Sequence, residues 1–429
     1  MKHIFLLFFF LSTFCLNSFS QQNRAFAITG QGKESFNWSD IRSIDMTSGN
    51  VVGLLFENGK SKFSYKDAET NRTIDQLFLK GITELPSLAN IQAKISPLEI
   101  NLKNPSPTFL MSAAIAYDKK HQKLFFASMH TQKLIWLDMS NNNGIPAFYT
   151  IEKPLVENKN ISDIAYDITR MTMGANGNGY ALTNDANHLI TFTTGQKIVI
   201  TDLGNLVDAE SNKGISVHNE CSSWGGDMVG DAFGKLYLFT ANHLVFEIDI
   251  QSRIATLKGS LLNLPATFSV NGAAVDENEN VIVSSANSFD GFYKIDMKNL
   301  TATKLVTHGQ VYNASDLASS NLLNQAQAKM EITQFPERNV IGNKLISIYP
   351  NPVSDGQIKI SFDNNVTGEY KITLTDLQGR LIENKTVYIN YPGQLENFKL
   401  KTKPVRGLYL IKVTDAVNQK IFSDKLIIE

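Results

Sequence analysis

The sequence predicts an all-β protein, a β-propeller followed by a small β-sandwich, on three observations. Its 27 Gly and 10% aromatic residues suit strands and tight turns better than helices. A pattern of four short strands recurs along residues 21–320, as in the blades of a propeller. Beyond residue 344, a second series of short strands alternates apolar and polar residues, which is typical of a sandwich.

The repeat is clearest in residues 225–257, where four apolar runs are separated by turn residues. In each unit the third strand ends in an apolar residue, an Asp and a second apolar residue. These steps are Ile44-Asp45-Met46, Leu137-Asp138-Met139, Ile248-Asp249-Ile250 and Ile295-Asp296-Met297. A short carboxylate that enters a turn accepts backbone N–H bonds, so we interpret these Asp residues as turn caps in preference to ligand-binding acids.

The first strand of each unit carries small or apolar residues ahead of an Asp turn. The sequence predicts these first strands at Ile115–Asp118, Ile164–Asp167, Met228–Asp231 and Ala273–Asp276. Small residues are expected at these places because the inner strands of a propeller crowd together near its axis.

The two ends of the repeat region are each incomplete. Arg24–Gly30, Ser39–Met46 and Val51–Glu57 have the pattern of second, third and fourth strands, and Asn313–Ser319 has that of a first strand. We therefore expect one blade to be built from both ends, which would close the ring without an open sheet edge. This arrangement gives five blades.

Residues 60–107 are too long for a plain connection between two blades. Ile74, Leu77 and Phe78 stand at helical spacing, and Gly81 is placed to end a helix. We interpret the segment as an inserted helix and loop. A sixth, degenerate blade is the alternative.

Residues 1–20 predict a secretory signal peptide. Lys2 and His3 precede the apolar run Ile4–Leu16, and small residues follow at the cleavage position. The run of about 13 apolar residues is shorter than the roughly 20 that a membrane span needs, so no transmembrane segment is expected in the mature chain. Removal of the signal leaves Cys221 alone, which excludes an internal disulfide.

The charges balance, with 40 Lys and Arg against 41 Asp and Glu. A basic patch for nucleic acid or for an anionic membrane is therefore not expected. Residues 321–344 are rich in Asn, Gln and Ala and predict a linker. Residues 345–429 predict about seven short strands, the number in a small immunoglobulin-like sandwich.

Motifs in this last segment stand in a distinctive order. They are Ile348-Tyr-Pro-Asn-Pro-Val353, Tyr370-Lys-Ile-Thr-Leu-Thr-Asp-Leu-Gln-Gly-Arg380, Gly407-Leu-Tyr-Leu-Ile-Lys-Val413 and the terminal Lys425-Leu-Ile-Ile-Glu429. Their order and spacing resemble the type A C-terminal sorting domain of the type IX secretion system of the Bacteroidetes. The residues that carry the resemblance are Tyr349, Pro350, Asn351, Pro352, Gly379, Gly407, Tyr409 and Lys425.

The resemblance implies a route and partners. The signal peptide would take the chain to the periplasm, and the type IX secretion machinery would take it across the outer membrane. A sorting peptidase would then remove the sorting domain and leave the protein on the cell surface or released. The N-terminal region resembles uncharacterised propeller cargo proteins of the same bacteria through Ala25–Gly30, Trp38–Asp45 and Ala113–Asp118, a likeness that implies fold more than function.

The residue ahead of each first strand is expected at one mouth of the central tunnel. Around the ring these residues are Ala114, Asp163, Asp227, Gly272 and Asp316. Three carboxylates on one axis could bind a divalent cation such as calcium through oxygen ligands. The interpretation that we favour is that each Asp caps its own turn. His218-Asn-Glu-Cys221 gathers metal-binding and acid/base residue types, but it is expected to be a polar loop.

Three functions are consistent with this pattern. The leading hypothesis is a secreted or surface-attached propeller that binds a glycan, a peptide or another surface protein through the loops of one face. The rival is a metal-dependent hydrolase, similar in fold to lactonase propellers, with its site at the tunnel mouth. The third is a structural surface protein.

Overall fold

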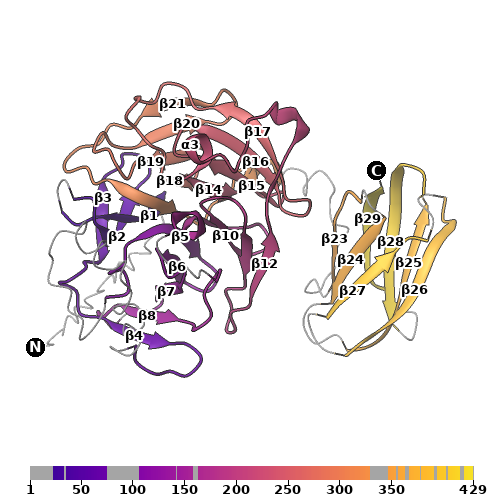
Figure 1. Cartoon of the computed structure of the whole chain (residues 1–429). Helices are drawn as coiled ribbons and strands as arrows, with labels where there is room; N and C mark the ends of the chain where they lie inside the picture. Colours follow the sequence, from indigo (N-terminus) through magenta and orange to yellow (C-terminus); the bar gives the residue numbers. More distant parts are fainter. Residues whose placement is uncertain are drawn as a thin grey trace, which may run out of the picture. The chain divides into compact units, whose positions relative to one another are not determined.

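The computed structural model describes residues 23–32, 35–74, 106–141, 143–157, 163–328, 346–353, 356–362, 367–376, 378–390, 394–401, 404–415 and 420–428. The chain divides into two compact units, Met1–Gln334 and Phe335–Glu429 (Figure 1). Strands dominate both units, which confirms the all-β prediction. The predicted signal peptide, residues 1–20, lies outside the described residues.

The described residues of the first unit form five sheets. The first has the order β22-β1-β2-β3, with β22 at Ala314–Ala318, β1 at Arg24–Gly30, β2 at Trp38–Asp45 and β3 at Val51–Phe56. The second has the order β4-β8-β7-β6-β5, with strands at Ser64–Asp67, Ala147–Thr150, Leu134–Asp138, Lys123–Ser128 and Ser112–Asp118. The third has the order β12-β11-β10-β9, with strands at Ile200–Gly204, Leu189–Phe192, Gly179–Thr183 and Ile168–Met173.

The fourth sheet has the order β13-β17-β16-β15-β14, with strands at Val207–Asp208, Ile254–Ser260, Leu244–Asp249, Lys235–Phe239 and Asp227–Gly230. The fifth has the order β18-β19-β20-β21, with strands at Gly272–Val275, Val281–Ser284, Tyr293–Asp296 and Thr301–Lys304. In every sheet the strand that comes first in the repeat stands at one end of the order. We call β5, β9, β14, β18 and β22 the inner strands.

Each inner strand contacts the inner strands of two other sheets. β22 lies against β5, β5 against β9, β9 against β14, β14 against β18, and β18 against β22. Apolar side chains fill the spaces between consecutive sheets, and Ala27, Ile44, Ala274 and Phe292 form the cluster that joins the first sheet to the fifth. The expected sheet built from both ends of the unit is present, because β1 pairs with β22 with Ala27 opposite Leu317.

The third sheet departs from the sequence prediction. Ile164–Tyr166, where a first strand is predicted, is a 3-10 helix, η1. The inner strand is β9, which begins four residues later. The prediction of a strand was wrong. Asp163 caps η1 by accepting the Ala165 N–H, and η1 is followed by Asp167. This short helix therefore has the same sequence pattern as a first strand, with small or apolar residues before an Asp.

The predicted insertion also contains a strand. β4 pairs in parallel with β8 at the outer edge of the second sheet, with Tyr65 opposite Phe148. Of the expected helix, Leu77 and Phe78 lie outside the described residues. In the fourth sheet β13 pairs in parallel with the outer strand β17, whereas β3 pairs with β2 alone among the described strands.

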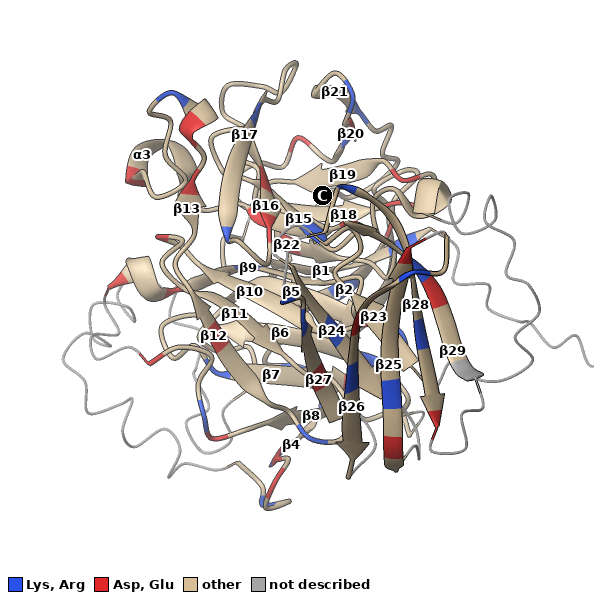
Figure 2. Cartoon of the chain, turned by 90° about the vertical axis from the view of Figure 1, so that its right-hand side faces the viewer, with Lys and Arg blue, Asp and Glu red and all other residues tan. Residues whose placement is uncertain are grey.

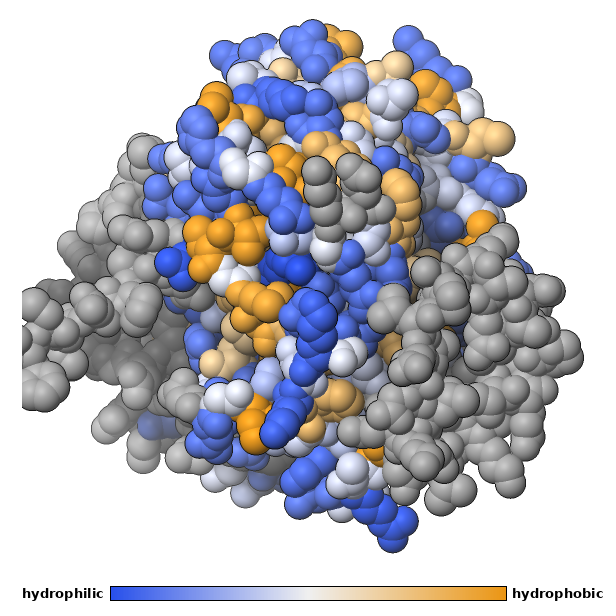
Figure 3. All heavy atoms as spheres, turned by 90° about the vertical axis from the view of Figure 1, so that its left-hand side faces the viewer, coloured by the Kyte–Doolittle hydropathy of each residue, from blue (hydrophilic) through white to orange (hydrophobic). Residues whose placement is uncertain are grey.

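The outer strand β3 therefore leaves apolar side chains exposed. Val52 and Leu54 are 45% and 53% exposed. Figure 3 views the molecule from the side on which β3 lies in Figure 1, and hydrophobic residues gather near the middle of that face. Two irregularities in the β2–β3 register bend this edge, a common protection of an edge strand against pairing with another chain.

The second unit contains two sheets. The first has the order β23-β24-β27, with strands at Ile346–Tyr349, Gln357–Phe362 and Gln394–Lys399. The second has the order β26-β25-β28-β29, with strands at Leu381–Ile389, Gly368–Asp376, Gly407–Asp415 and Lys420–Ile428. Both sheets share one hydrophobic core, to which Ile360 and Phe398 contribute from one sheet and Ile372 and Ile411 from the other. All seven strands that the sequence predicts are present.

Charged residues of both signs are interspersed on β25, β26 and β28 (Figure 2), as the balanced composition leads one to expect. In the part of the chain that the structure describes, no helix has the length and apolar character that crossing a membrane requires.

Candidate functional site

The three predicted tunnel-mouth acids do not lie together. Asp227 is the first residue of β14 and Asp316 lies in the middle of β22, and both are 0% exposed. Asp163 is half-buried at the start of η1, where its carboxylate accepts the Ala165 N–H at 3.1 Å. The structure brings Asp227 and Asp316 into direct contact through a hydrogen bond between their carboxyl groups, and it leaves Asp163 in a local cap.

The two carboxyl groups collect one backbone N–H from every inner strand. Asp316 accepts those of Ile115 on β5, at 2.8 Å, and Leu317 on β22, at 2.5 Å. Asp227 accepts those of Ala273 on β18 and Met228 on β14, both at 2.6 Å, and that of Met171 on β9. The pair is therefore the point at which all five sheets of the first unit are tied together. We call it the carboxyl hub.

Gly272 on β18 leaves room for the hub. A Cβ atom at this position would stand 2.5 Å from Ser284 Oγ and 2.8 Å from backbone atoms of Asp316 and Leu317. These distances are far below van der Waals contact, so no side chain fits without displacing β22. Because Gly272 stands one residue ahead of Ala273, its missing side chain allows the carboxyl groups of Asp227 and Asp316 to meet beside β18.

The electrostatics of the hub favour a proton over a metal. Burial raises the pKa of both carboxyl groups, and the charge of Asp227 raises the pKa of Asp316 further. Five N–H dipoles point their positive ends at the pair, the opposite of what a cation needs. Among the described residues, no three His, Cys, Asp or Glu side chains are grouped to hold a metal ion. The residues present do not fit the calcium site that the sequence suggested.

Arg170 stands on β9 where the sequence predicted no functional residue. Its guanidinium is fully buried and donates to the carbonyl oxygens of Thr183 at 2.6 Å, Asn184 at 3.1 Å, Ser223 at 2.7 Å and Gly225 at 2.9 Å. Burial lowers its pKa to about 10, so it remains charged at neutral pH, and its charge acts on Asp227. The position of Arg170 on β9 is equivalent to that of Asp227 on β14 and of Asp316 on β22. Each of these three residues directly precedes a residue whose backbone N–H donates to the hub.

The sequence also predicted no functional role for a further buried acid, Asp167. Its Oδ1 accepts the backbone N–H of His130 at 2.8 Å and the Gln132 side-chain amide at 3.0 Å, and its Oδ2 lies 3.7 Å from His130 Nδ1. Burial raises the pKa of Asp167. The sequence placed Asp167 at the end of a strand, and no local signal links it to His130, 37 residues away.

The segment His218–Cys221 begins as a polar loop, as predicted, but its last two residues belong to a short helix. His218 Nδ1 lies 2.8 Å from the carbonyl oxygen of Asp185, and Nε2 lies 3.1 Å from that of Leu206. Asn219 caps the short helix α3 (Glu220–Ser223), and Cys221 is exposed. Both ring nitrogens of His218 therefore contact backbone carbonyls, and neither approaches the thiol.

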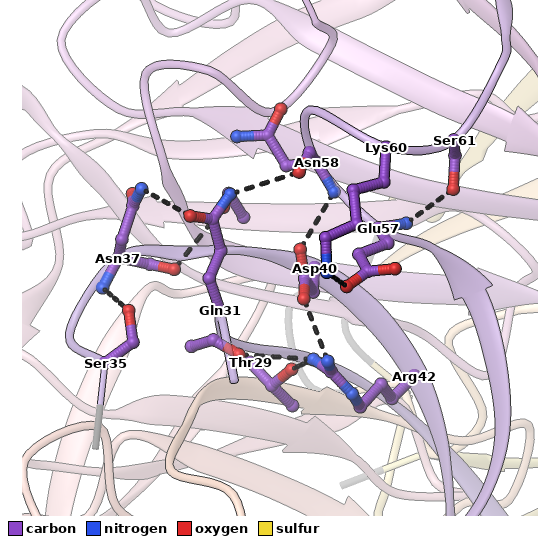
Figure 4. Close-up of polar contacts among 12 residues, drawn as sticks. Thr29, Gln31, Ser35, Asn37, Asp40, Arg42, Glu57, Asn58, Lys60 and Ser61 are labelled. Atoms are coloured by element: carbon purple, nitrogen blue, oxygen red, sulfur yellow. Dashed lines mark hydrogen bonds and ion pairs between the residues drawn. The ribbon is translucent and has the colours of Figure 1, made fainter. Parts of the chain in front are cut away.

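A buried ion pair joins Asp40 and Arg42 of β2 (Figure 4). Arg42 Nη2 lies 2.9 Å from Asp40 Oδ2, and the other oxygen of Asp40 accepts the Asn58 N–H at 2.9 Å. Arg42 Nη1 donates to Thr29 Oγ1, and its guanidinium carbon lies 4.1 Å from the centre of the Tyr312 ring. Burial raises the pKa of Asp40. The donors of Arg42 are directed at protein atoms, so we assign this group a structural role.

Aromatic and polar side chains meet on the face where the inner strands begin. The β1–β2 loop carries Phe36, which is 54% exposed, and the β19–β20 loop carries Phe289, at 5.6 Å between ring centres in an edge-to-face arrangement. Asn287 is exposed beside Phe289 and donates to Ser269 Oγ at 3.2 Å. The register places both loops at this end, since Gly30 pairs with Trp38 and Gly272 with Ser284.

The sorting-motif residues fasten the start of the second unit to its last strand. Asn351 donates to the carbonyl oxygen of Lys425 at 2.8 Å and accepts the Ile427 N–H at 2.8 Å, between two residues, Pro350 and Pro352, that each follow a cis peptide bond. Tyr349 ends β23 and Lys425 lies in β29.

The other three motif residues shape turns and strand starts. Gly379 adopts a φ of +81° in the turn after β25, a value that glycine tolerates best. Gly407 opens β28, and the Tyr409 hydroxyl donates to the Val405 carbonyl oxygen at 2.6 Å. The residues of the sequence motif therefore help to build the fold of this unit.

Comparisons with known proteins support the sorting-domain prediction for the second unit and say little about the first unit. Residues 347–429 match the family model of the secretion system C-terminal sorting domain. No curated protein sequence matches the chain.

Solved structures align at low identity. PorZ of Porphyromonas gingivalis, an essential surface component of the type-IX secretion system, is 11% identical with a TM-score of 0.31, and the alignment covers 94% of this chain and 51% of PorZ. A protein of unknown function from Bacteroides thetaiotaomicron is 12% identical with a TM-score of 0.36, covering 70% of this chain and 71% of that one. Virginiamycin B lyase from Staphylococcus aureus is 10% identical with a TM-score of 0.26, covering 73% and 83%. The chain thus spans about half of PorZ, and similarities this weak carry no functional argument.

The sequence motif, the fold of the second unit and the family match point to one conclusion. The C-terminal unit is a type IX secretion system C-terminal sorting domain, and the protein is a cargo that is exported to the cell surface or secreted.

Proposed function

We propose that the first unit is a five-bladed β-propeller that binds a glycan, a peptide or another surface protein outside the cell. The cycle of contacts among the five inner strands and the packing of the first sheet on the fifth support a closed ring of blades. The proposed boundaries are a signal peptide at 1–20, the propeller at 21–320, a linker at 321–344 and the sorting domain at 345–429. The partners during export are the type IX machinery and its sorting peptidase.

The observation that carries the binding proposal is the pair of the exposed Phe36 and the half-buried Phe289, with the exposed Asn287 beside it. Exposed aromatic rings offer flat apolar surface to a sugar ring or a peptide side chain, and amide groups add directional hydrogen bonds. The pair lies on loops, the part of a propeller that usually carries binding sites. A hydrolase is not favoured, because the described residues hold no metal-binding group and the hub faces backbone amides.

Glycan and peptide arrays probed with the full mature chain test this proposal. We expect binding to a defined subset of ligands, and a loss of at least tenfold in affinity for the double variant Phe36→Ala, Phe289→Ala. The matched control is Phe233→Ala, because Phe233 is 45% exposed but lies in the β14–β15 turn at the other end of its sheet. Arrays without binding would instead favour a structural surface protein, and equal loss in the control would place the site elsewhere.

A further inference from the structure

The carboxyl hub has more hydrogen-bond donors around it than an ordinary turn cap. Five backbone N–H groups, one from each inner strand, and a bond between the two carboxyl groups converge on Asp227 and Asp316. These residues stand on β14 and β22, which are not neighbours, since β18 contacts both. The hub is thus a direct side-chain link between β14 and β22.

A hydrogen bond between two carboxyl groups requires one proton between them. The charged group that faces the pair from the packed strands is Arg170 on β9, and its charge acts on Asp227. β5 and β18 present Ala114 and Gly272 at the same level, neither of which titrates. Arg170 therefore favours the ionised form of Asp227, and the proton belongs on Asp316. Asp231, at the far end of β14, contacts a turn and not the hub.

We propose that the carboxyl hub is a proton-operated lock, in which the proton on Asp316 joins β14 to β22 and loss of this proton releases β22 from the other inner strands. Two unprotonated carboxylates in contact repel one another, and burial prevents water from screening them. β22 is the strand that yields, because every other inner strand is followed directly in the chain by the strand that it pairs with, whereas β22 and its partner β1 come from opposite ends of the unit.

The direction of the pH dependence follows from burial. The folded chain holds the proton more tightly than the unfolded chain, in which an Asp has its ordinary pKa of about 3.9. The stabilisation by this proton is complete below that pKa and is lost as the pH rises through the folded-state pKa. Between the unfolded-state pKa and the folded-state pKa, loss of one proton on opening increases the opening constant of β22 by about tenfold per pH unit, and the increase levels off above the folded-state pKa.

Hydrogen exchange of the full chain between pH 5 and 9, corrected for intrinsic exchange rates, measures this opening. We expect the protection of the Ile115 and Leu317 amides to fall with pH while that of β16 amides stays level. The variant Asp316→Asn should abolish the dependence, because its amide N–H takes the place of the proton. Asp163→Asn is the control and should behave as the wild type, since Asn also caps helices.

Two results would overturn the lock. The first is equal pH dependence of β22 and β16 in the wild type, a comparison that needs no variant to fold. The second is a folded Asp316→Asn variant whose β22 opening still rises tenfold per pH unit.

Discussion

Arg170 is predicted to be the most sensitive single position of the first unit. The variant Arg170→Met keeps much of the volume and removes the guanidinium. It leaves four buried backbone carbonyls, those of Thr183, Asn184, Ser223 and Gly225, without this donor. An orphaned buried acceptor costs about 1–3 kcal/mol. The Thr183 carbonyl still accepts the Ala186 N–H at 3.0 Å, so three carbonyls are orphaned. Backbone carbonyls have a second lone pair and can relax, so the lower bound is appropriate, and the total is about 3 kcal/mol.

The opposing effect is the free-energy cost of burying the Arg170 charge, which is absent in the variant. A buried charge replaced by an apolar side chain can be neutral when its partners are replaced as well. Here the partners are backbone atoms and remain, so destabilisation dominates. Arg170→Lys keeps a charge but cannot reach four carbonyls with three N–H groups, and we expect a loss of about 2 kcal/mol.

Urea unfolding of the full chain, followed by tryptophan fluorescence, measures both losses. All three tryptophans, Trp38, Trp136 and Trp224, lie in the first unit, so the signal does not report the sorting domain. The slope of the free energy against urea should not change. A loss below about 1 kcal/mol for Arg170→Met would refute the reasoning, because it would mean that the carbonyls of Asn184, Ser223 and Gly225 find other donors.

Two further predictions concern the packing of the hub and the sorting domain. Gly272→Ala forces a Cβ to 2.5 Å from Ser284 Oγ and should lower the stability of the first unit by about 1–3 kcal/mol in the same assay. Gly195→Ala, with no atom within 4 Å of the new Cβ, should change it by less than about 0.5 kcal/mol, and equal effects would contradict the packing argument. Asn351→Ala removes two bonds to β29 and should destabilise the sorting domain by about 1–2 kcal/mol, seen as faster exchange of the Ile427 amide, while unchanged exchange would show that the two bonds are dispensable.

The sequence predicts strands well where the repeat is regular. β14 to β17 and all seven strands of the sorting domain lie where the alternation and the turn residues place them. It fails at Ile164–Tyr166, because an Asp-capped 3-10 turn has the same local pattern as the end of a first strand. β4 was missed since its partner, β8, lies about eighty residues away and the pairing depends on that contact.

The candidate site was predictable only in part. The repeat alignment placed Asp227 and Asp316 at equivalent positions, and they do meet. It placed Asp163 with them because the register of the third sheet was displaced, and the equivalent residue there is Arg170. Arg170 and Asp167 act through partners that are distant in sequence, at Ser223 and His130, and no local pattern reports such contacts.

Export through the sorting domain is the central claim, and cell fractionation of two chains tests it most directly. In a host with type IX secretion, the full chain should reach the cell exterior in a form shorter by the mass of the sorting domain. A chain that ends at Lys344 should fold and accumulate in the periplasm, because it keeps the first unit and lacks the matched residues 347–429. Appearance of the truncated chain outside the cell would contradict the account, and the C-terminal unit would then have to act in binding and not in sorting.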